Sequence, residues 1–248
     1  MSGRVTGPVL ILGATSDMAR AVARAFAARG CAIQLAAREP AALEGDRADL
    51  ETRYGVAVSL HAFDALDVAG HAAFVTGLPE LPQVAISAVG LMGEQAENAA
   101  DMTRAAEVMR ANFEGPATIL GALANAMEAR GSGTLVGISS VAGERGRASN
   151  YVYGSAKAGF TAYLSGLRNR LADKGVHVVT VLPGFVATKM TEGMDLPARL
   201  VAQPEEVAQA IVAAVERGQE VIYVRRIWRL IMAVIRAIPE TIFKKTSI

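Results

Sequence analysis

Tyr153 and Lys157 are the residues of this sequence best suited to proton transfer. Side chains four positions apart on a helix lie on the same face, so the lysine ammonium is expected close to the tyrosine phenol. A nearby positive charge favours the phenolate, and we expect it to lower the pKa of Tyr153 below its usual value of about 10. Such a pair can exchange a proton with a substrate near neutral pH.

A second candidate for chemistry is the turn that follows the apolar run at residues 9–12. Gly13 opens this turn, and Thr15, Ser16, Asp17 and Met18 lead into a helical stretch. A strand, turn and helix in this order can place backbone N–H groups against a pyrophosphate. Because Asp17 and the alanine two residues later replace glycines of the usual three-glycine pattern, a purely structural turn is an equally good interpretation.

Two charged residues follow the next two apolar runs. Arg38 stands where an acid would select NAD, and its guanidinium is suited to the 2′-phosphate of NADP. We therefore predict NADP rather than NAD, the alternative being a solvated surface arginine. Asp64 is placed to accept a hydrogen bond from the adenine amino group, and the alternative for Asp64 is a helix N-cap.

Short apolar runs alternate with longer amphipathic stretches along the whole chain. The predicted strands are residues 9–12, 32–36, 58–62, 84–88, 134–138, 176–182 and 220–224, and the predicted helices are residues 19–29, 41–54, 71–77, 103–130, 153–174 and 204–217. This alternation predicts an α/β fold with a single Rossmann-like, doubly wound sheet of seven parallel strands. Ligands of such sheets bind beyond the carboxyl ends of the strands, where all the candidate residues lie.

Composition narrows the class of protein further. A chain of 248 residues with 52% hydrophobic residues fits one large domain, which we place at residues 1–224, followed by a tail at 225–248. The formal net charge of +1 gives no general attraction to nucleic acid. Three separated histidines and one cysteine predict neither a metal site nor a disulfide. With no signal peptide or membrane span recognisable, we predict a cytoplasmic protein.

Taken together, these motifs resemble the short-chain dehydrogenase/reductase family over nearly the whole chain. They are Gly13-xxx-Asp17, Asp64, Ser87-Ala88-Val89-Gly90, Asn112, Ser140, Tyr153-xxx-Lys157 and Pro183-Gly184-xxx-Thr188. The resemblance implies an NAD(P)-dependent oxidoreductase. In it Tyr153 gives a proton to a substrate carbonyl, Ser140 donates a hydrogen bond to the same oxygen, Lys157 holds the nicotinamide ribose, and Asn112 positions a water molecule.

The resemblance also implies cofactor contacts from residues that carry no chemistry themselves. These are Ala88, Gly90, Pro183, Gly184, Val186 and Thr188, in addition to the turn residues, Arg38, Asp64, Tyr153 and Lys157. Thr188 would bind the carboxamide of the nicotinamide, and its alternative is a helix cap. Residues 190–201 show no regular helical or strand periodicity, which predicts a mobile flap over the substrate.

The tail at residues 225–248 predicts a basic amphipathic helix. It carries six basic residues and one acid, and on a helical wheel Arg225, Arg229 and Arg236 fall within about 40° of one another. The apolar arc, which includes Trp228, covers about 200°. Two interpretations remain open: the helix packs on this domain or on a second subunit, or Trp228 and the isoleucines enter the surface of an anionic membrane.

Three functions are compatible with these observations. Segments 88–93, 142–147 and 238–245 resemble a subgroup of the family that reduces the keto group of a polyprenyl-phosphate-linked pentose alongside a flavin oxidase. In a protein of this subgroup, Arg145 and Arg147 would bind the phosphate of the substrate. The alternative is that both arginines belong to a solvated loop. The alternatives are a soluble reductase of a small ketone or alcohol with the tail used for oligomerisation, and a redox-inactive nucleotide-binding scaffold. Family resemblance implies a homodimer or homotetramer.

Overall fold

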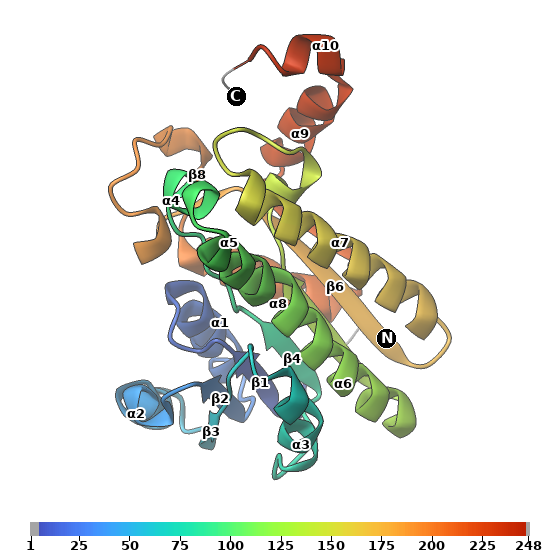
Figure 1. Cartoon of the computed structure of the whole chain (residues 1–248). Coiled ribbons are helices and arrows are strands. Elements are labelled where there is room, and N and C mark those ends of the chain that lie inside the picture. The colour runs from blue at the N-terminus through green and yellow to red at the C-terminus, as the bar shows by residue number, and fades with distance from the viewer. Residues whose placement is uncertain (1–4, 247–248) are drawn as a thin grey trace.

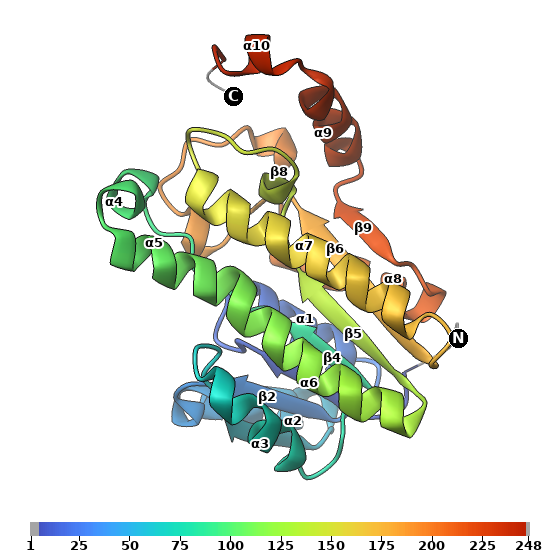
Figure 2. The ribbon, with the colours of Figure 1, turned by 45° about the vertical axis from the view of Figure 1, so that its right-hand side comes forward.

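Strand β1 (Val9–Leu12) is buried on both faces, and its side chains divide between two apolar cores. Val9 and Ile11 pack with helices α1 (Asp17–Ala27) and α8 (Pro204–Arg217). Leu10 and Leu12 pack on the other side with α6 (Gly115–Arg130) and α7 (Tyr151–Leu171). Successive strand residues point to opposite faces, so a continuous apolar run suits a strand between two helical layers. Figures 1 and 2 show these layers in a computed structural model, which describes residues 5–246.

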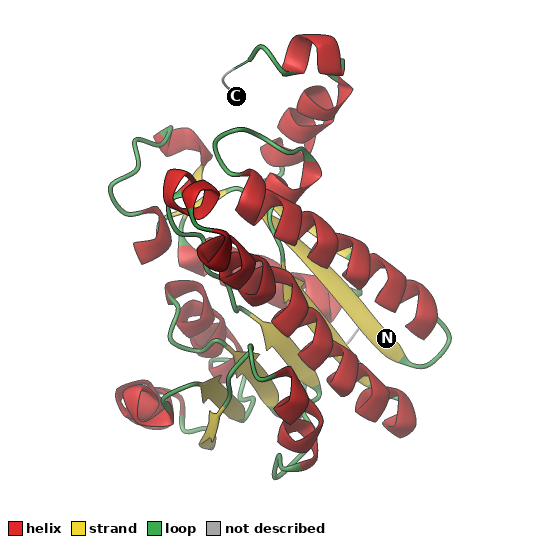
Figure 3. Ribbon diagram, in the orientation of Figure 1, coloured by secondary structure: helices red, strands yellow, loops and turns green. Residues whose placement is uncertain are grey.

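The seven predicted strands form one parallel sheet, and the prediction of a doubly wound fold is confirmed (Figure 3). Their order across the sheet is β3-β2-β1-β4-β5-β6-β9. The strands after β1 are β2 (Ile33–Ala37), β3 (Val58–Ala62), β4 (Val84–Ser87), β5 (Gly133–Ile138), β6 (Val176–Pro183) and β9 (Val221–Val224). Each predicted strand end is correct to within one residue. A short separate pair, β7 (Phe185–Val186) and β8 (Val201–Ala202), was not predicted.

The direction of strand progression reverses between β1 and β4, which are neighbours in the sheet. Gly13 follows β1, has φ +78°, and lies so near the chain after β4 that an added Cβ would be 3.0 Å from the backbone nitrogen of Val89. Only glycine combines this backbone conformation with this close approach. The two strand ends are thus held together at the point where doubly wound sheets bind their ligands.

The long helix predicted over residues 103–130 is interrupted. It consists of α5 (Met102–Met109), a π-helical turn (Arg110–Glu114) and α6, and it is preceded by an unpredicted helix, α4 (Gln95–Ala100). Pro116 explains the interruption, because a proline ring clashes with the carbonyl group four residues earlier, here that of Asn112. The remaining helices are α2 (Glu44–Tyr54) and α3 (His71–Thr76).

The tail forms α9 (Ile227–Ala237) and α10 (Glu240–Phe243), beyond the carboxyl end of β9 (Figures 1 and 2). Arg225 does not belong to the helix as predicted, because it has φ +59° and its guanidinium binds Glu206 at 3.0 Å. Trp228 is buried with Val141 and Leu182 of the main domain, so the expectation that it enters a lipid headgroup region is wrong for this structure. None of the helices described between residues 5 and 246 has the length and apolar character to cross a membrane.

Candidate active site

Three of the four predicted catalytic residues, Ser140, Tyr153 and Lys157, meet at one place in the fold. Ser140 follows β5, and its Oγ accepts a 3.1 Å hydrogen bond from the backbone of Ala142, which leaves the hydroxyl proton free to be donated. Its hydroxyl is hydrogen-bonded to the phenol of Tyr153, from the first turn of α7. One turn later on α7, Lys157 Nζ donates to the carbonyl oxygen of Ile138 at 3.0 Å and lies 5.7 Å from the Tyr153 ring centroid.

Burial sets the charge states of this pair. Burial raises the pKa of Tyr153 to about 12, and the hydrogen bond from Ser140 offsets only part of this rise. Burial lowers the pKa of Lys157 to about 7. The expectation that Lys157 depresses the pKa of Tyr153 is therefore wrong for the protein alone, because burial disfavours the charged form of both groups. At neutral pH the phenol keeps its proton, as a proton donor must.

Asn112 lies in the π-helical turn and is fully buried. Its Nδ2 donates to the carbonyl oxygen of Val108 at 2.8 Å, and its Oδ1 accepts a hydrogen bond from the backbone of Leu91. A Cβ built on Gly90 would lie 3.2 Å from Asn112 Oδ1 and 3.8 Å from Lys157 Nζ. The amide and the ammonium therefore flank the same glycine. Such π-helical turns are often found at functional sites.

A cavity of about 740 Å³ extends from the turn after β1 to this constellation. Ser140, Tyr153 and Lys157 line it, together with most of the predicted cofactor residues: Thr15, Ser16, Asp17, Met18, Ala88, Gly90, Pro183, Gly184, Val186 and Thr188. Gly13, Arg38, Asp64 and Asn112 do not line it. The volume is within the range of ordinary ligand pockets.

The residues present fit a dinucleotide. Gly13 leaves the backbone after β1 free of side-chain atoms, and Ser16 caps α1 by accepting from the backbone of Ala19 at 3.2 Å. This 11-residue helix presents its N-terminus to the cavity, where partial positive charge suits a pyrophosphate. Asp17 has another use: its Oδ2 accepts a 2.9 Å hydrogen bond from the backbone of Lys189, the residue directly before the predicted flap at residues 190–201.

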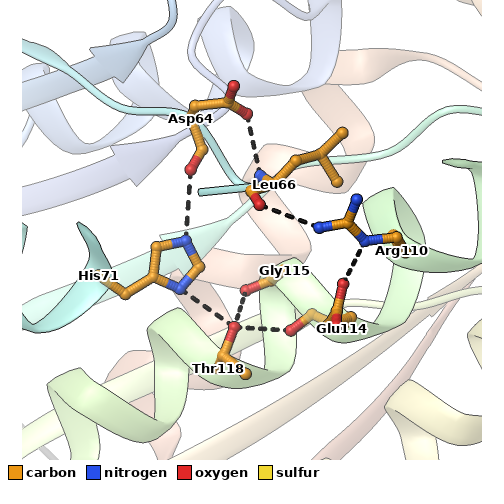
Figure 4. Close-up of polar contacts among 7 residues, drawn as sticks. All are labelled: Asp64, Leu66, His71, Arg110, Glu114, Gly115 and Thr118. Carbon is orange, nitrogen blue, oxygen red and sulfur yellow. Dashed lines mark hydrogen bonds and ion pairs between the residues drawn. The ribbon is translucent and has the colours of Figure 1, made fainter. Parts of the chain in front are cut away.

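Arg38 and Asp64 are exposed and follow the carboxyl ends of β2 and β3. Asp64 is not a helix N-cap; its carboxylate accepts from the backbone of Leu66 at 2.9 Å. Its carbonyl oxygen lies 3.3 Å from Nε2 of His71, whose Nδ1 lies 3.0 Å from Thr118 Oγ1 (Figure 4).

This network joins the loop after β3 to the π-helical turn. Arg110 donates to the carbonyl oxygen of Leu66 at 3.1 Å and pairs with Glu114 at 2.6 Å (Figure 4). His71 is buried and stacks on Phe63. Its role here is structural. Among residues 5–246, no group of three or more His, Cys, Asp and Glu side chains is arranged to hold a metal ion.

Comparison with known proteins identifies the family. Residues 8–197 match the short chain dehydrogenase family, which is more than half of the chain. The chain belongs to the short-chain dehydrogenases. An uncharacterised oxidoreductase of Mycobacterium tuberculosis (strain H37Rv) is 38% identical over 241 residues, which cover 96% of each chain. Another, from Streptomyces coelicolor, is 38% identical over 244 residues and covers 96% of this chain and 94% of the relative.

Solved structures share the same fold. A putative NAD(P)-dependent gluconate 5-dehydrogenase from Beutenbergia cavernae has a TM-score of 0.83 and 22% identity, covering 92% of this chain and 98% of that one. A short-chain dehydrogenase from Burkholderia cenocepacia has a TM-score of 0.83 and 21% identity, covering 98% of both. Family membership makes this short-chain dehydrogenase an NAD(P)-dependent oxidoreductase.

One wall of the cavity includes a residue of the tail, which the sequence predicted to lie outside the catalytic domain. Trp228 lines the cavity and covers Gly184, where an added Cβ would lie 2.0 Å from the indole. Phe185 meets the indole edge-on at a centroid distance of 5.3 Å, and Trp228 Nε1 donates to the carbonyl oxygen of Leu200 at 3.4 Å. The apolar arc of α9 was the only sequence signal for this contact, and it did not specify a partner.

The two arginines predicted to meet a phosphate occupy different environments. Arg145 pairs with Glu240 at 2.6 Å and lies over the ring of Phe243, so it attaches α10 to the domain. Arg147 lines the cavity. Thr188 caps a short 3₁₀ turn through a capping box with Thr191, which is the structural alternative considered for it, and it also lines the cavity.

Proposed function

We propose that this short-chain dehydrogenase is an NADPH-dependent ketoreductase in which Tyr153 protonates the substrate carbonyl oxygen. The observation that carries the proposal is a phenol that burial keeps protonated, hydrogen-bonded to Ser140 on the wall of a cavity large enough for cofactor and substrate. Bound NADPH supplies the hydride that reaches the carbonyl carbon. Thr15, Ser16 and Met18 would hold the phosphates, while Lys157, Val186 and Thr188 would hold the nicotinamide half.

The protein residues supply the proton and stabilise the negative charge that develops on the carbonyl oxygen. Tyr153 transfers its proton to the carbonyl oxygen while Ser140 donates a hydrogen bond to the same oxygen, which stabilises the developing negative charge. Lys157, with a pKa lowered to about 7 by burial, can both release and accept a proton at neutral pH. Asn112 keeps the backbone beside Gly90 in place next to this ammonium.

NADPH rather than NADH is proposed as the reductant. Arg38 stands exposed directly after β2 with a guanidinium suited to a 2′-phosphate. The structural neighbours from Beutenbergia cavernae and Burkholderia cenocepacia were both solved with NADP. The overall test is NADPH consumption by the purified protein with a panel of aliphatic and sugar ketones. Turnover with at least one ketone supports the proposal, and a protein that binds NADPH but reduces none contradicts it.

We further propose that the ketone is carried on a polyprenyl-phosphate pentose. Support comes from the resemblance of segments 88–93, 142–147 and 238–245 to the reductase subunit of the decaprenylphosphoryl-ribose 2′-epimerase, whose ketone is produced by a flavin oxidase. The product of such an oxidase, supplied with NADPH and this protein, should be reduced to the epimerised alcohol. An unchanged keto-sugar would contradict this assignment and leave the small-ketone reductase as the alternative.

A lipid-linked substrate is compatible with the free surface of the tail. Ile227, Leu230, Val234 and Ile242 leave 45–63% of their surface exposed. Ile227, Leu230 and Val234 lie within about 60° on the α9 wheel. The same tail also carries four exposed cations, Arg226, Arg229, Lys244 and Lys245. We propose that this surface binds an anionic bilayer, because apolar side chains bordered by cations suit that interface.

Sedimentation with vesicles tests this surface. The protein should pellet with phosphatidylglycerol vesicles and not with phosphatidylcholine vesicles, and replacing Leu230 and Val234 by serine should abolish pelleting. Met102→Ser, which changes an exposed residue of α5, serves as the matched control. Pelleting that the double variant retains would contradict the proposal. A wild-type homodimer or homotetramer that the double variant converts to monomers would show that the surface binds a second copy.

A further inference from the structure

Arg147 is a cation in the cavity wall without a counter-ion. Its Nε is buried and has no hydrogen-bond partner, and none of the carboxylates among residues 5–246 pairs with its guanidinium. Burial lowers the pKa of Arg147, and no neighbouring acid raises it. Glu144, three residues earlier, instead contacts Tyr223 at 2.8 Å and Arg236 at 3.3 Å. A buried donor without a partner costs free energy unless a ligand satisfies it.

Two other polar side chains of the same cavity are also incompletely bonded. Gln95 Oε1 accepts from the backbone of Val152 at 3.3 Å, which leaves its Nε2 buried without a partner. Asn150 donates its backbone N–H to the carbonyl oxygen of Arg147 at 3.1 Å, so the two residues close one turn. Asn150 Oδ1 is buried without a partner and makes no capping bond to α7.

These three residues line the same cavity, and backbone hydrogen bonds connect each of them to the start of α7. Asn150 is its N-cap residue, and Gln95 holds the backbone of its second residue. Tyr153 is three residues beyond Asn150, a rise of about 4.5 Å along a helix. Because Tyr153 lines the same cavity, a group bound by these residues can belong to the same molecule as the reacting carbonyl. The positive end of a 21-residue helix adds to the attraction for an anion.

We infer that Arg147, Gln95 and Asn150 form a subsite for a phosphate ester carried by the keto substrate. Arg147 and Gln95 offer N–H donors to phosphate oxygens, and Asn150 Oδ1 accepts from a hydroxyl group next to the phosphate. The chemical class is a phosphorylated polyhydroxy ketone, from either a free sugar phosphate or a lipid-linked one. The inference rests on the proposed reductase function and specifies its substrate.

Calorimetry on the full-length protein saturated with NADP⁺ tests the subsite without requiring turnover. The probes are D-ribulose 5-phosphate, the unphosphorylated D-ribulose, and farnesyl phosphate as a lipid phosphate. Occupation of the cofactor site by NADP⁺ keeps the probes from binding there. The wild-type protein should bind D-ribulose 5-phosphate at least about 10-fold more tightly than D-ribulose, because a hydrogen bond to a charged group has that effect or more.

Arg147→Gln should reduce this preference about 10- to 100-fold, whereas Arg147→Lys should retain part of it. Arg145→Gln removes the same charge two residues away from an arginine already paired with Glu240, and it should keep the preference. Equal binding of the phosphorylated and plain sugars, or an unchanged preference in Arg147→Gln, would overturn the inference. Tighter binding of farnesyl phosphate than of the sugar phosphate, lost in Arg147→Gln, would support the subsite with a lipid-linked source.

Reduction of the same two ketoses by NADPH separates the inference from the proposed function. A preference for the phosphorylated ketose in kcat/KM that Arg147→Gln abolishes supports both. If the protein reduces ketones but shows no preference for the phosphorylated ketose, the phosphate subsite is contradicted and the reductase function is not. Phosphate-dependent binding with no turnover of any ketone contradicts only the reductase.

Discussion

The two walls of the cavity differ in how well their polar atoms are satisfied. On the catalytic wall, Ser140, Tyr153 and Lys157 are joined to one another or to the backbone by hydrogen bonds. On the substrate wall, Arg147 and Gln95 present buried polar atoms without partners. A catalytic group must already be in position when the substrate arrives, whereas a binding group acquires its partner from the substrate. The unsatisfied polar atoms of Arg147 and Gln95 therefore mark the part of the cavity that is suited to bind a ligand.

The largest effect is expected on the catalytic wall. Tyr153→Phe removes the proton donor and should reduce kcat about 100- to 10,000-fold, the range typical of general acid catalysis. NADPH binding, measured by fluorescence, should stay close to that of the wild type. Tyr151→Phe is the matched control, because Tyr151 is half-exposed and does not line the cavity. Equal activity of both variants would show that Tyr153 is not the donor.

On the substrate wall, the corresponding change is Trp228→Ala. It removes a buried indole from Gly184 and should lower the free energy of unfolding by about 3–5 kcal/mol, as measured by urea denaturation. Leu230→Ala on the exposed side of the same helix should change it by only about 0.5 kcal/mol. If the two variants lose stability equally, the tail does not contribute to the wall as described.

In the protein without cofactor, burial of Lys157 on the catalytic wall lowers the free energy of unfolding at neutral pH. The pKa of Lys157 is lowered from 10.5 to about 7, so between these values the unfolded chain binds more protons than the folded one. The contribution of Lys157 to the free energy of unfolding should therefore rise with pH from about 7 to about 10. The thermal midpoint of Lys157→Met should rise less than that of the wild type over this window. The exposed Lys174→Met should follow the wild type, and a parallel slope for Lys157→Met would contradict the assigned pKa.

The sequence predicted the residues of the catalytic wall but only Arg147 on the substrate wall, and the reason is physical. Tyr153 and Lys157 are related by helical spacing, and the strands around them are short apolar runs, so local pattern is sufficient. The contact of Trp228 with Gly184 joins residues far apart in the chain, and an apolar arc is compatible with several partners. The π-helical turn at Asn112 had a local signal in Pro116 that a continuous helical period concealed.

The sequence also could not predict the direction of a pKa shift or which arginine forms an ion pair. The raised pKa of Tyr153 depends on burial of its phenol, which no spacing reveals, whereas we expected Lys157 to lower this pKa. Likewise, Arg145 and Arg147 are two residues apart in one segment and look equivalent in the sequence. Only the fold shows that the first is paired with Glu240 and that the second faces the cavity.

The smallest effect is expected at Arg38, which belongs to neither wall. Arg38→Ala should raise KM for NADPH by about 10-fold and leave KM for NADH nearly unchanged, because an exposed guanidinium that binds a 2′-phosphate contributes at the lower end of charged hydrogen bonds. Initial rates with both reductants measure this ratio. Arg53→Ala, an exposed arginine of α2 paired with Asp49, controls for the loss of one positive charge. If KM rises equally for both reductants, or only with the control, Arg38 does not select the phosphate, and cofactor choice must reside in the turn after β1.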